Sequence, residues 1–94
     1  MSRREVEPIT ELGKQLEKER INRGLTKEAW IALLGVSKPT YLSWLRGAQP
    51  DLESIFLIAE TLGITDVEVF SWVAADRAKG VYLNSPSRPA LVAA

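Results

Sequence analysis

Apolar residues recur along this chain at spacings of three and four, and glycines interrupt the pattern at regular intervals. Such spacing places apolar side chains on one face of a helix, and no stretch shows the sustained period-two alternation of a strand. A glycine just past a helix end adopts the left-handed backbone that other residues resist. Five of the six glycines stand at such points: Gly24, Gly35, Gly47, Gly63 and Gly80. The pattern therefore predicts one compact all-α domain of five helices.

The residues between the glycines predict where each helix begins. Thr26 and Ser37 are suitable N-caps for the second and third helices. Pro39 fits the first turn of the third, because its missing N–H costs nothing there. Thr65 and Glu68 have the spacing of a capping box at the start of the fifth. The expected helical spans are about 9–23, 27–34, 38–46, 50–62 and 65–79.

Helical spacing also predicts which side chains face inward. The expected inner residues are Ile9, Leu12 and Leu16 in the first helix, Leu52, Ile55, Phe56, Ala59 and Leu62 in the fourth, and Val69, Phe70 and Val73 in the fifth. Residues 1–8 are expected to form a flexible arm, residues 9–80 the helical domain, and residues 81–94 a tail rich in proline and small residues.

The composition argues against several classes of chemistry. The 94 residues include no cysteine and no histidine, so we expect neither a disulfide framework nor a metal site built from thiolates or imidazoles. No nucleophile stands beside a base and no loop is suited to cradle phosphates, so we expect neither an enzyme nor a cofactor. No apolar run reaches the length of a membrane span, and none follows the first residues as in a signal peptide. We therefore expect a soluble cytoplasmic protein without a membrane partner.

The formal net charge is zero, but the charges are unevenly distributed. Residues 1–50 hold nine Lys/Arg and six Asp/Glu, whereas residues 51–94 hold three and six. Such an asymmetry is typical of a domain with one basic face, and it leaves open the alternative of an unevenly solvated surface.

The run L-T-K-E-A-W-I-A-L-L-G-V-S-K-P-T-Y-L-S-W-L-R-G, residues 25–47, resembles the helix-turn-helix of the phage-repressor and Cro-like family of bacterial and phage regulators. The continuation P-D-L-E-S-I-F-L-I-A-E-T-L-G-I-T-D-V-E-V-F, residues 50–70, is similar to the same family. The resemblance implies a five-helix, lambda-repressor-like DNA-binding domain whose second and third helices form the helix-turn-helix. It also implies a transcriptional regulator of phage or bacterial type that binds double-stranded DNA and places helix 38–46 in the major groove.

The resemblance assigns roles to individual residues. Lys27 falls where the family usually has a glutamine that bonds a phosphate, and Arg46 where it often has a phosphate-binding asparagine. Lys38 would donate to guanine O6 or N7. The residues implied to contact DNA are Thr26, Lys27, Ser37, Lys38, Pro39, Leu42, Ser43 and Arg46, together with Arg3 and Arg4 in a basic N-terminal arm. The residues implied to be buried between the third helix and the body are Val36, Tyr41 and Trp44.

Three residues depart from the family pattern. Pro39 stands where members often place a base-reading glutamine, and Ile31 replaces a small residue between the two helices. Leu45 replaces a frequent glutamate that pairs with the arginine matched here by Arg20, so Arg20 needs another partner or open solvent.

A second interpretation of the function is favoured by the neutral net charge and by Pro39, Leu42 and Leu45. In it the chain is a protein-interaction module on a degenerate helix-turn-helix scaffold, antitoxin-like or a phage-encoded partner of a host protein.

A second apolar cluster lies away from the third helix. Leu57, Val67 and Trp72 occupy positions where the family pattern expects exposed polar or mixed residues. Because repressors of this family often dimerise through the last helix of the domain, we expect a homodimer built around Leu57, Trp72 and the fifth helix. The alternative is that residues 81–83 fold back over these side chains within one chain.

Overall fold

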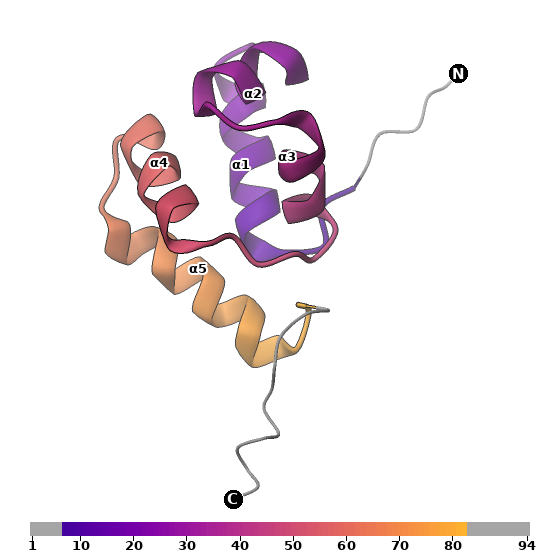
Figure 1. Cartoon of the computed structure of the whole chain (residues 1–94), viewed down its shortest axis with the longest axis vertical. Coiled ribbons are helices and arrows are strands. Elements are labelled where there is room, and N and C mark those ends of the chain that lie inside the picture. The colour runs from indigo at the N-terminus through magenta and orange to yellow at the C-terminus, as the bar shows by residue number, and fades with distance from the viewer. Residues whose placement is uncertain (1–6, 83–94) are drawn as a thin grey trace, which may run out of the picture.

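The computed structural model describes residues 7–82 of the chain. In that range it consists of α-helices, with no strand, as the sequence pattern predicts (Figure 1). The helices are α1 Glu11–Asn22, α2 Lys27–Leu34, α3 Lys38–Leu45, α4 Leu52–Leu62 and α5 Asp66–Lys79. The expected all-α fold of five helices is therefore confirmed. Arg3 and Arg4, and the tail from residue 83 onward, lie outside the described residues.

Every helix begins after a residue whose side-chain oxygen accepts a backbone N–H of the first turn. This contact satisfies one of the donors that a helix start leaves without an intrahelical partner. The five capping residues are Thr10, Thr26, Ser37, Asp51 and Thr65. The caps predicted at Thr26, Ser37 and Thr65 are confirmed. Local sequence thus sets the start of most helices in this fold.

The first helix begins two residues later than the sequence predicts, and Ile9 is exposed rather than buried. The N–H of Ile9 donates to the carbonyl of Leu45 over 2.9 Å. The hydroxyl of Thr10 accepts from the N–H of Gly13 (2.8 Å) and donates to the carbonyl of Trp44 (3.1 Å). These contacts with the end of α3 hold the chain extended at Thr10, so α1 starts only after it.

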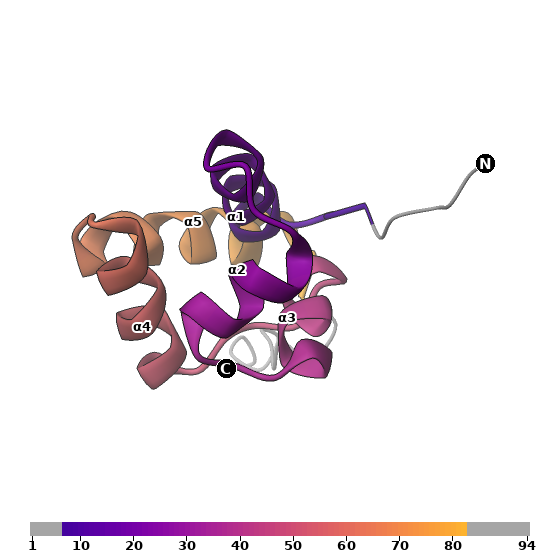
Figure 2. The same cartoon turned by 90° about the horizontal axis from the view of Figure 1, so that it is seen from above.

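The core lies where the five helices meet. α1 contacts both α3 and α5, and α4 also packs against α5. α2 contacts α3 and α4, and the view in Figure 2 shows it between them. The buried apolar residues are Leu12, Leu16, Trp30, Ile31, Leu34, Tyr41, Trp44, Leu45, Ile55, Ile58, Ala59, Val69, Val73 and Tyr82. This shared core fixes α2 and α3 relative to the rest of the domain.

Two residues of α4 predicted to face inward are exposed instead. Leu52 and Phe56 lie on the surface, whereas Ile58 and Ala59 are buried. Two rows of apolar residues in α4 have helical spacing, so the sequence alone does not distinguish them. The contacts of α4 with α2 and α5 bury the row that contains Ile58.

α5 packs against the core through one narrow row and through its C-terminal end. Val69 and Val73 are buried, whereas Phe70, predicted to face inward, is exposed because it follows Val69 by one residue and so lies about 100° around the helix. Beyond the helix, Tyr82 is buried and its hydroxyl bonds the carboxylate of Asp76. The packed part of the chain therefore extends past residue 80, where the tail was expected to begin.

Candidate nucleic-acid interface

A three-residue turn joins α2 to α3. Gly35 ends α2 in the left-handed conformation, with a φ of 79°, and donates its N–H to carbonyls of the last turn. Ser37 then caps α3. Two helices joined in this way cross steeply, which allows the first to brace on a DNA backbone and the second to enter the major groove. The structure therefore contains the helix-turn-helix geometry that the sequence predicts.

The inner side of α3 is aromatic and apolar. Tyr41, Trp44 and Leu45 are buried, and the rings of Tyr41 and Trp44 meet edge to face with centroids 6.2 Å apart. The predicted burial of Tyr41 and Trp44 is confirmed. Val36, predicted to be buried, is half-buried and packs against the same core. The aromatic residues of α3 thus hold the helix to the body rather than facing solvent.

The outer side of α3 carries few groups able to hydrogen-bond a base. Lys38, Pro39 and Arg46 are exposed. Leu42 and Ser43 are half-buried, and Leu42 packs against the core. The hydroxyl of Ser43 donates to the carbonyl of Thr40 over 2.6 Å, within its own helix. Lys38 on α3 and Arg46, the residue that ends the helix, therefore carry the groups best placed to reach a nucleic acid.

The starts of α2 and α3 lie at the surface, where both capping residues are exposed. The hydroxyl of Thr26 accepts from the N–H of Ala29 over 3.1 Å. The hydroxyl of Ser37 accepts from the N–H of Thr40 and donates to its side-chain oxygen. The Ser37 hydroxyl therefore uses its proton within the protein, whereas the Thr26 hydroxyl only accepts here and can still donate to an anion, as can the backbone N–H groups of both helix starts.

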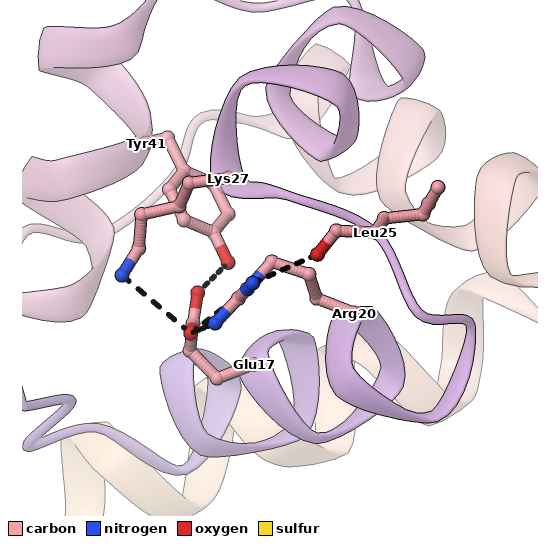
Figure 3. A network of polar contacts seen from close by, with 5 residues as sticks. All are labelled: Glu17, Arg20, Leu25, Lys27 and Tyr41. Atoms are coloured by element: carbon pink, nitrogen blue, oxygen red, sulfur yellow. Dashed lines mark hydrogen bonds and ion pairs between the residues drawn. The ribbon is translucent and has the colours of Figure 1, made fainter.

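A buried carboxylate links the start of α2 to α3 and α1. Figure 3 shows Glu17 of α1 surrounded by three partners. Its carboxylate accepts a hydrogen bond from the Tyr41 hydroxyl at 2.5 Å and from the Arg20 guanidinium at 3.0 Å. The ammonium of Lys27 lies 3.7 Å from the same carboxylate. Arg20 also donates to the carbonyl of Leu25 over 2.8 Å. Lys27, the expected phosphate ligand, therefore belongs to an ion-pair cluster.

This cluster supplies the partner that Arg20 lacked in the sequence pattern. Leu45, at the family's usual glutamate position, is fully buried in the core. Glu17, three residues before Arg20 on the same helix, provides the carboxylate instead. Burial and the adjacent Glu17 raise the pKa of Tyr41 well above its ordinary value, so its hydroxyl remains a donor even in alkaline solution.

The residues expected at a dimer contact lie on α4 and α5. Leu57 is 37 % exposed and Val67 is exposed, whereas Trp72 is half-buried against the core. Tyr82 turns towards Asp76 at the opposite end of α5 from Val67. The dimer contacts of Leu57, Val67 and Trp72 remain predictions, and so do the DNA contacts of the residues in α2 and α3.

Sequence reasoning missed Glu17 as a member of the site. The sequence does indicate that Glu17 lies beside Arg20, because residues three apart on a helix are neighbours. Its approach to Tyr41 and Lys27 depends on how α1 packs against the next two helices, which no local pattern encodes. Among residues 7–82 there is no cluster of side chains suited to hold a metal ion, and no helix there is long and apolar enough to span a bilayer.

Comparisons with known proteins agree with this geometry. A family model described as helix-turn-helix matches residues 16–69, from within α1 to within α5, which is more than half of the chain. No curated protein and no solved structure matches significantly.

Proposed function

The chain belongs to the phage-repressor and Cro-like helix-turn-helix family, and we propose that within this family it is a sequence-specific transcriptional regulator of phage or bacterial type. Membership supports a DNA-binding regulator, and this family is generally non-enzymatic. In the proposed complex, α3 enters the major groove and α2 braces on the backbone.

The observation that carries this proposal is that both helices of the helix-turn-helix carry cations at their ends. Lys27 stands in the first turn of α2, Lys38 is exposed in the first turn of α3, and Arg46 is exposed where α3 ends. Lys38 would read guanine O6 or N7, whereas Lys27 and Arg46 would bind phosphates. Docking through cations fits a helix whose hydroxyl groups, on Thr40, Tyr41 and Ser43, all make hydrogen bonds within the protein.

Binding to random double-stranded DNA tests the proposed docking on the DNA backbone, and binding to a selected genomic sequence tests the recognition of bases by α3. Lys27→Ala with Arg46→Ala should weaken binding to all DNA alike and lower the salt slope by about one unit for each residue. Lys38→Ala should alter sequence preference among genomic fragments selected on the wild-type protein. Lys79→Ala, at the exposed end of α5, is the control and should leave both properties unchanged. Unchanged affinity and salt slope in the Lys27/Arg46 double variant would show that the proposed docking is wrong.

A second candidate is a protein-interaction module on this scaffold. The observation that favours it is the outer side of α3, where Pro39 and Leu42 have no side-chain group that hydrogen-bonds a base and the Ser43 hydroxyl donates its proton within the helix. The discriminating experiment is a gel shift with random DNA at low salt. A DNA-binding domain should show at least nonspecific binding, with a Kd of roughly 10⁻⁴–10⁻⁶ M at physiological salt and lower values below it. Absence of any shift favours the protein partner.

The proposed regulator acts as a homodimer. A single module of this kind buries little DNA surface, and pairing two modules on adjacent half-sites multiplies affinity. Exposed apolar side chains at Leu57 and Val67, on α4 and α5, support this part of the proposal.

A further inference from the structure

The carboxylate of Glu17 lies 3.7 Å from the Lys27 ammonium, close enough to compete with a DNA phosphate for it. We propose that Glu17 is a built-in counterion that limits sequence-independent DNA binding by holding the Lys27 ammonium. The inference rests on the proposed function, because it concerns the same DNA-binding surface. It makes Glu17 a positioning residue that acts on DNA through Lys27 without touching it.

The contacts around Glu17 differ in strength. Tyr41 and Arg20 lie 2.5 Å and 3.0 Å from the carboxylate, whereas Lys27 lies 3.7 Å away. The two short contacts are hydrogen bonds to a charged acceptor, which are about twice as strong as neutral ones. Lys27 therefore has the loosest hold on the carboxylate. Its long stem allows the ammonium to move towards a phosphate while Glu17 stays in place.

Glu17 is unable to follow Lys27 or to turn into solvent. Its side chain is only 11 % exposed and is held from α1 and α3 at once, whereas that of Lys27 is 18 % exposed at the start of α2. A phosphate approaching Lys27 therefore meets a fixed negative charge behind the ammonium. Because this pair is only partly screened by water, the carboxylate offsets part of the attraction that Lys27 would otherwise exert.

The charge balance gives the direction of the expected change in DNA affinity. Glu17, Arg20 and Lys27 together carry a net charge of +1, and neutralising Glu17 raises it to +2. Glu17→Gln keeps the shape of the side chain and an oxygen that accepts from Tyr41. We expect this variant to bind random DNA roughly threefold to fivefold more tightly at low salt, the effect of one partly exposed ion pair. The gain should shrink as salt rises, which a purely structural effect would not do.

Two matched variants of the 94-residue chain isolate the role of Lys27. Glu60→Gln makes the same change of net charge on α4, which lies across α2 from α3 in Figure 2, and should leave affinity within about 1.5-fold of wild type. In a Lys27→Ala background, Glu17→Gln should give no gain beyond that of Glu60→Gln. Circular dichroism of each variant verifies that it is folded.

Three results would overturn the inference. An equal gain from Glu17→Gln and Glu60→Gln assigns the effect to overall charge. If the gain in affinity persists in the Lys27→Ala background, the effect of Glu17 acts through Arg20. If folded Glu17→Gln binds DNA more weakly than wild type, the carboxylate promotes DNA binding instead of limiting it. Absence of DNA binding in every variant, wild type included, refutes the proposed function and this inference with it, whereas the other results refute the inference alone.

A measurement on the wild-type protein covers the case in which Glu17→Gln does not fold. Addition of random DNA should shift the NMR resonances of the Lys27 ammonium nitrogen and of the Glu17 carboxyl carbon, because the ammonium leaves the carboxylate. Lys14, exposed on α1, serves as the reference side chain. A bound state in which the Glu17 carboxyl resonance is unchanged contradicts the proposed competition.

Discussion

The hydroxyl of Tyr82 donates a hydrogen bond of 3.1 Å to the carboxylate of Asp76, which is buried at the end of α5. The same carboxylate accepts the backbone N–H groups of Glu11 (2.7 Å) and Leu12 (3.2 Å) at the start of α1. A negative charge is favourable at a helix start, where N–H groups lack intrahelical partners. Asp76 therefore joins three segments of the chain: the start of α1, the end of α5 and the segment after it.

Asp76→Asn should destabilise the fold by about 1.5–3 kcal/mol, the usual worth of hydrogen bonds to a charged group. The variant keeps one acceptor oxygen but places an amide among donors and removes the charge from the helix start. Urea unfolding followed by circular dichroism measures the change. Glu60→Gln, an exposed acidic side chain of α4, is the control and should change stability by less than about 0.5 kcal/mol. Equal stability of the two variants would refute the role given to Asp76.

Stability should fall as pH rises above the ordinary tyrosine pKa. Burial raises the pKa of both Tyr41 and Tyr82, and these are the two tyrosines of the chain. Above about pH 10 the unfolded chain loses protons that the folded protein retains, so unfolding becomes easier with rising pH. Each tyrosine contributes a slope of up to about 1.4 kcal/mol per pH unit.

Tyr82→Phe isolates this contribution. Its free energy of unfolding should decline less steeply than that of wild type between about pH 10 and 11, because only Tyr41 then titrates in this way. Urea unfolding at several pH values gives the slopes, and ultraviolet absorbance shows that tyrosinate forms only on unfolding. Parallel declines in the two proteins would contradict the assignment.

Gly13→Ala should destabilise the protein although alanine favours helices by about 1 kcal/mol. An added Cβ would lie 2.9 Å from the Thr10 hydroxyl and 3.1 Å from a methyl of Leu45. The Thr10 hydroxyl is fixed by two hydrogen bonds and the Leu45 side chain is fully buried, so neither yields easily. We expect a net loss of about 1–2 kcal/mol in urea unfolding. Lys14→Ala, the next position of α1 and exposed, should show no such loss.

Local signals made most of the fold predictable. Capping residues such as Thr26 and Ser37 and the glycine at 35 act within one turn of the chain, so their consequences follow from the sequence nearby. The same holds for the helix-turn-helix, because its turn length and inner aromatic residues are encoded in one short run. Tyr41 and Trp44 are accordingly buried where the pattern indicates.

Contacts between distant segments were not predictable. Asp76 meets Glu11 across 65 positions, and the Tyr41 hydroxyl meets Glu17 across 24. In α4 the choice between the row of Phe56 and that of Ile58 depends on which helices pack beside it. The sequence therefore indicated that Lys27 stands at the start of α2, but not that an acidic residue of α1 lies beside its ammonium.

The exposed apolar residues of α4 and α5 lead to the last prediction, which concerns the homodimer. Leu57→Glu should shift the protein towards monomer in sedimentation at about 100 μM, because it places a charge among apolar side chains at the proposed contact. Ile21→Glu makes the same kind of change at an exposed position of α1 and should leave association unchanged. Trp72 is a poorer choice for substitution because it also packs against the core. A wild-type protein that is strictly monomeric at this concentration would refute the dimer, and equal association of the two variants would place the contact elsewhere.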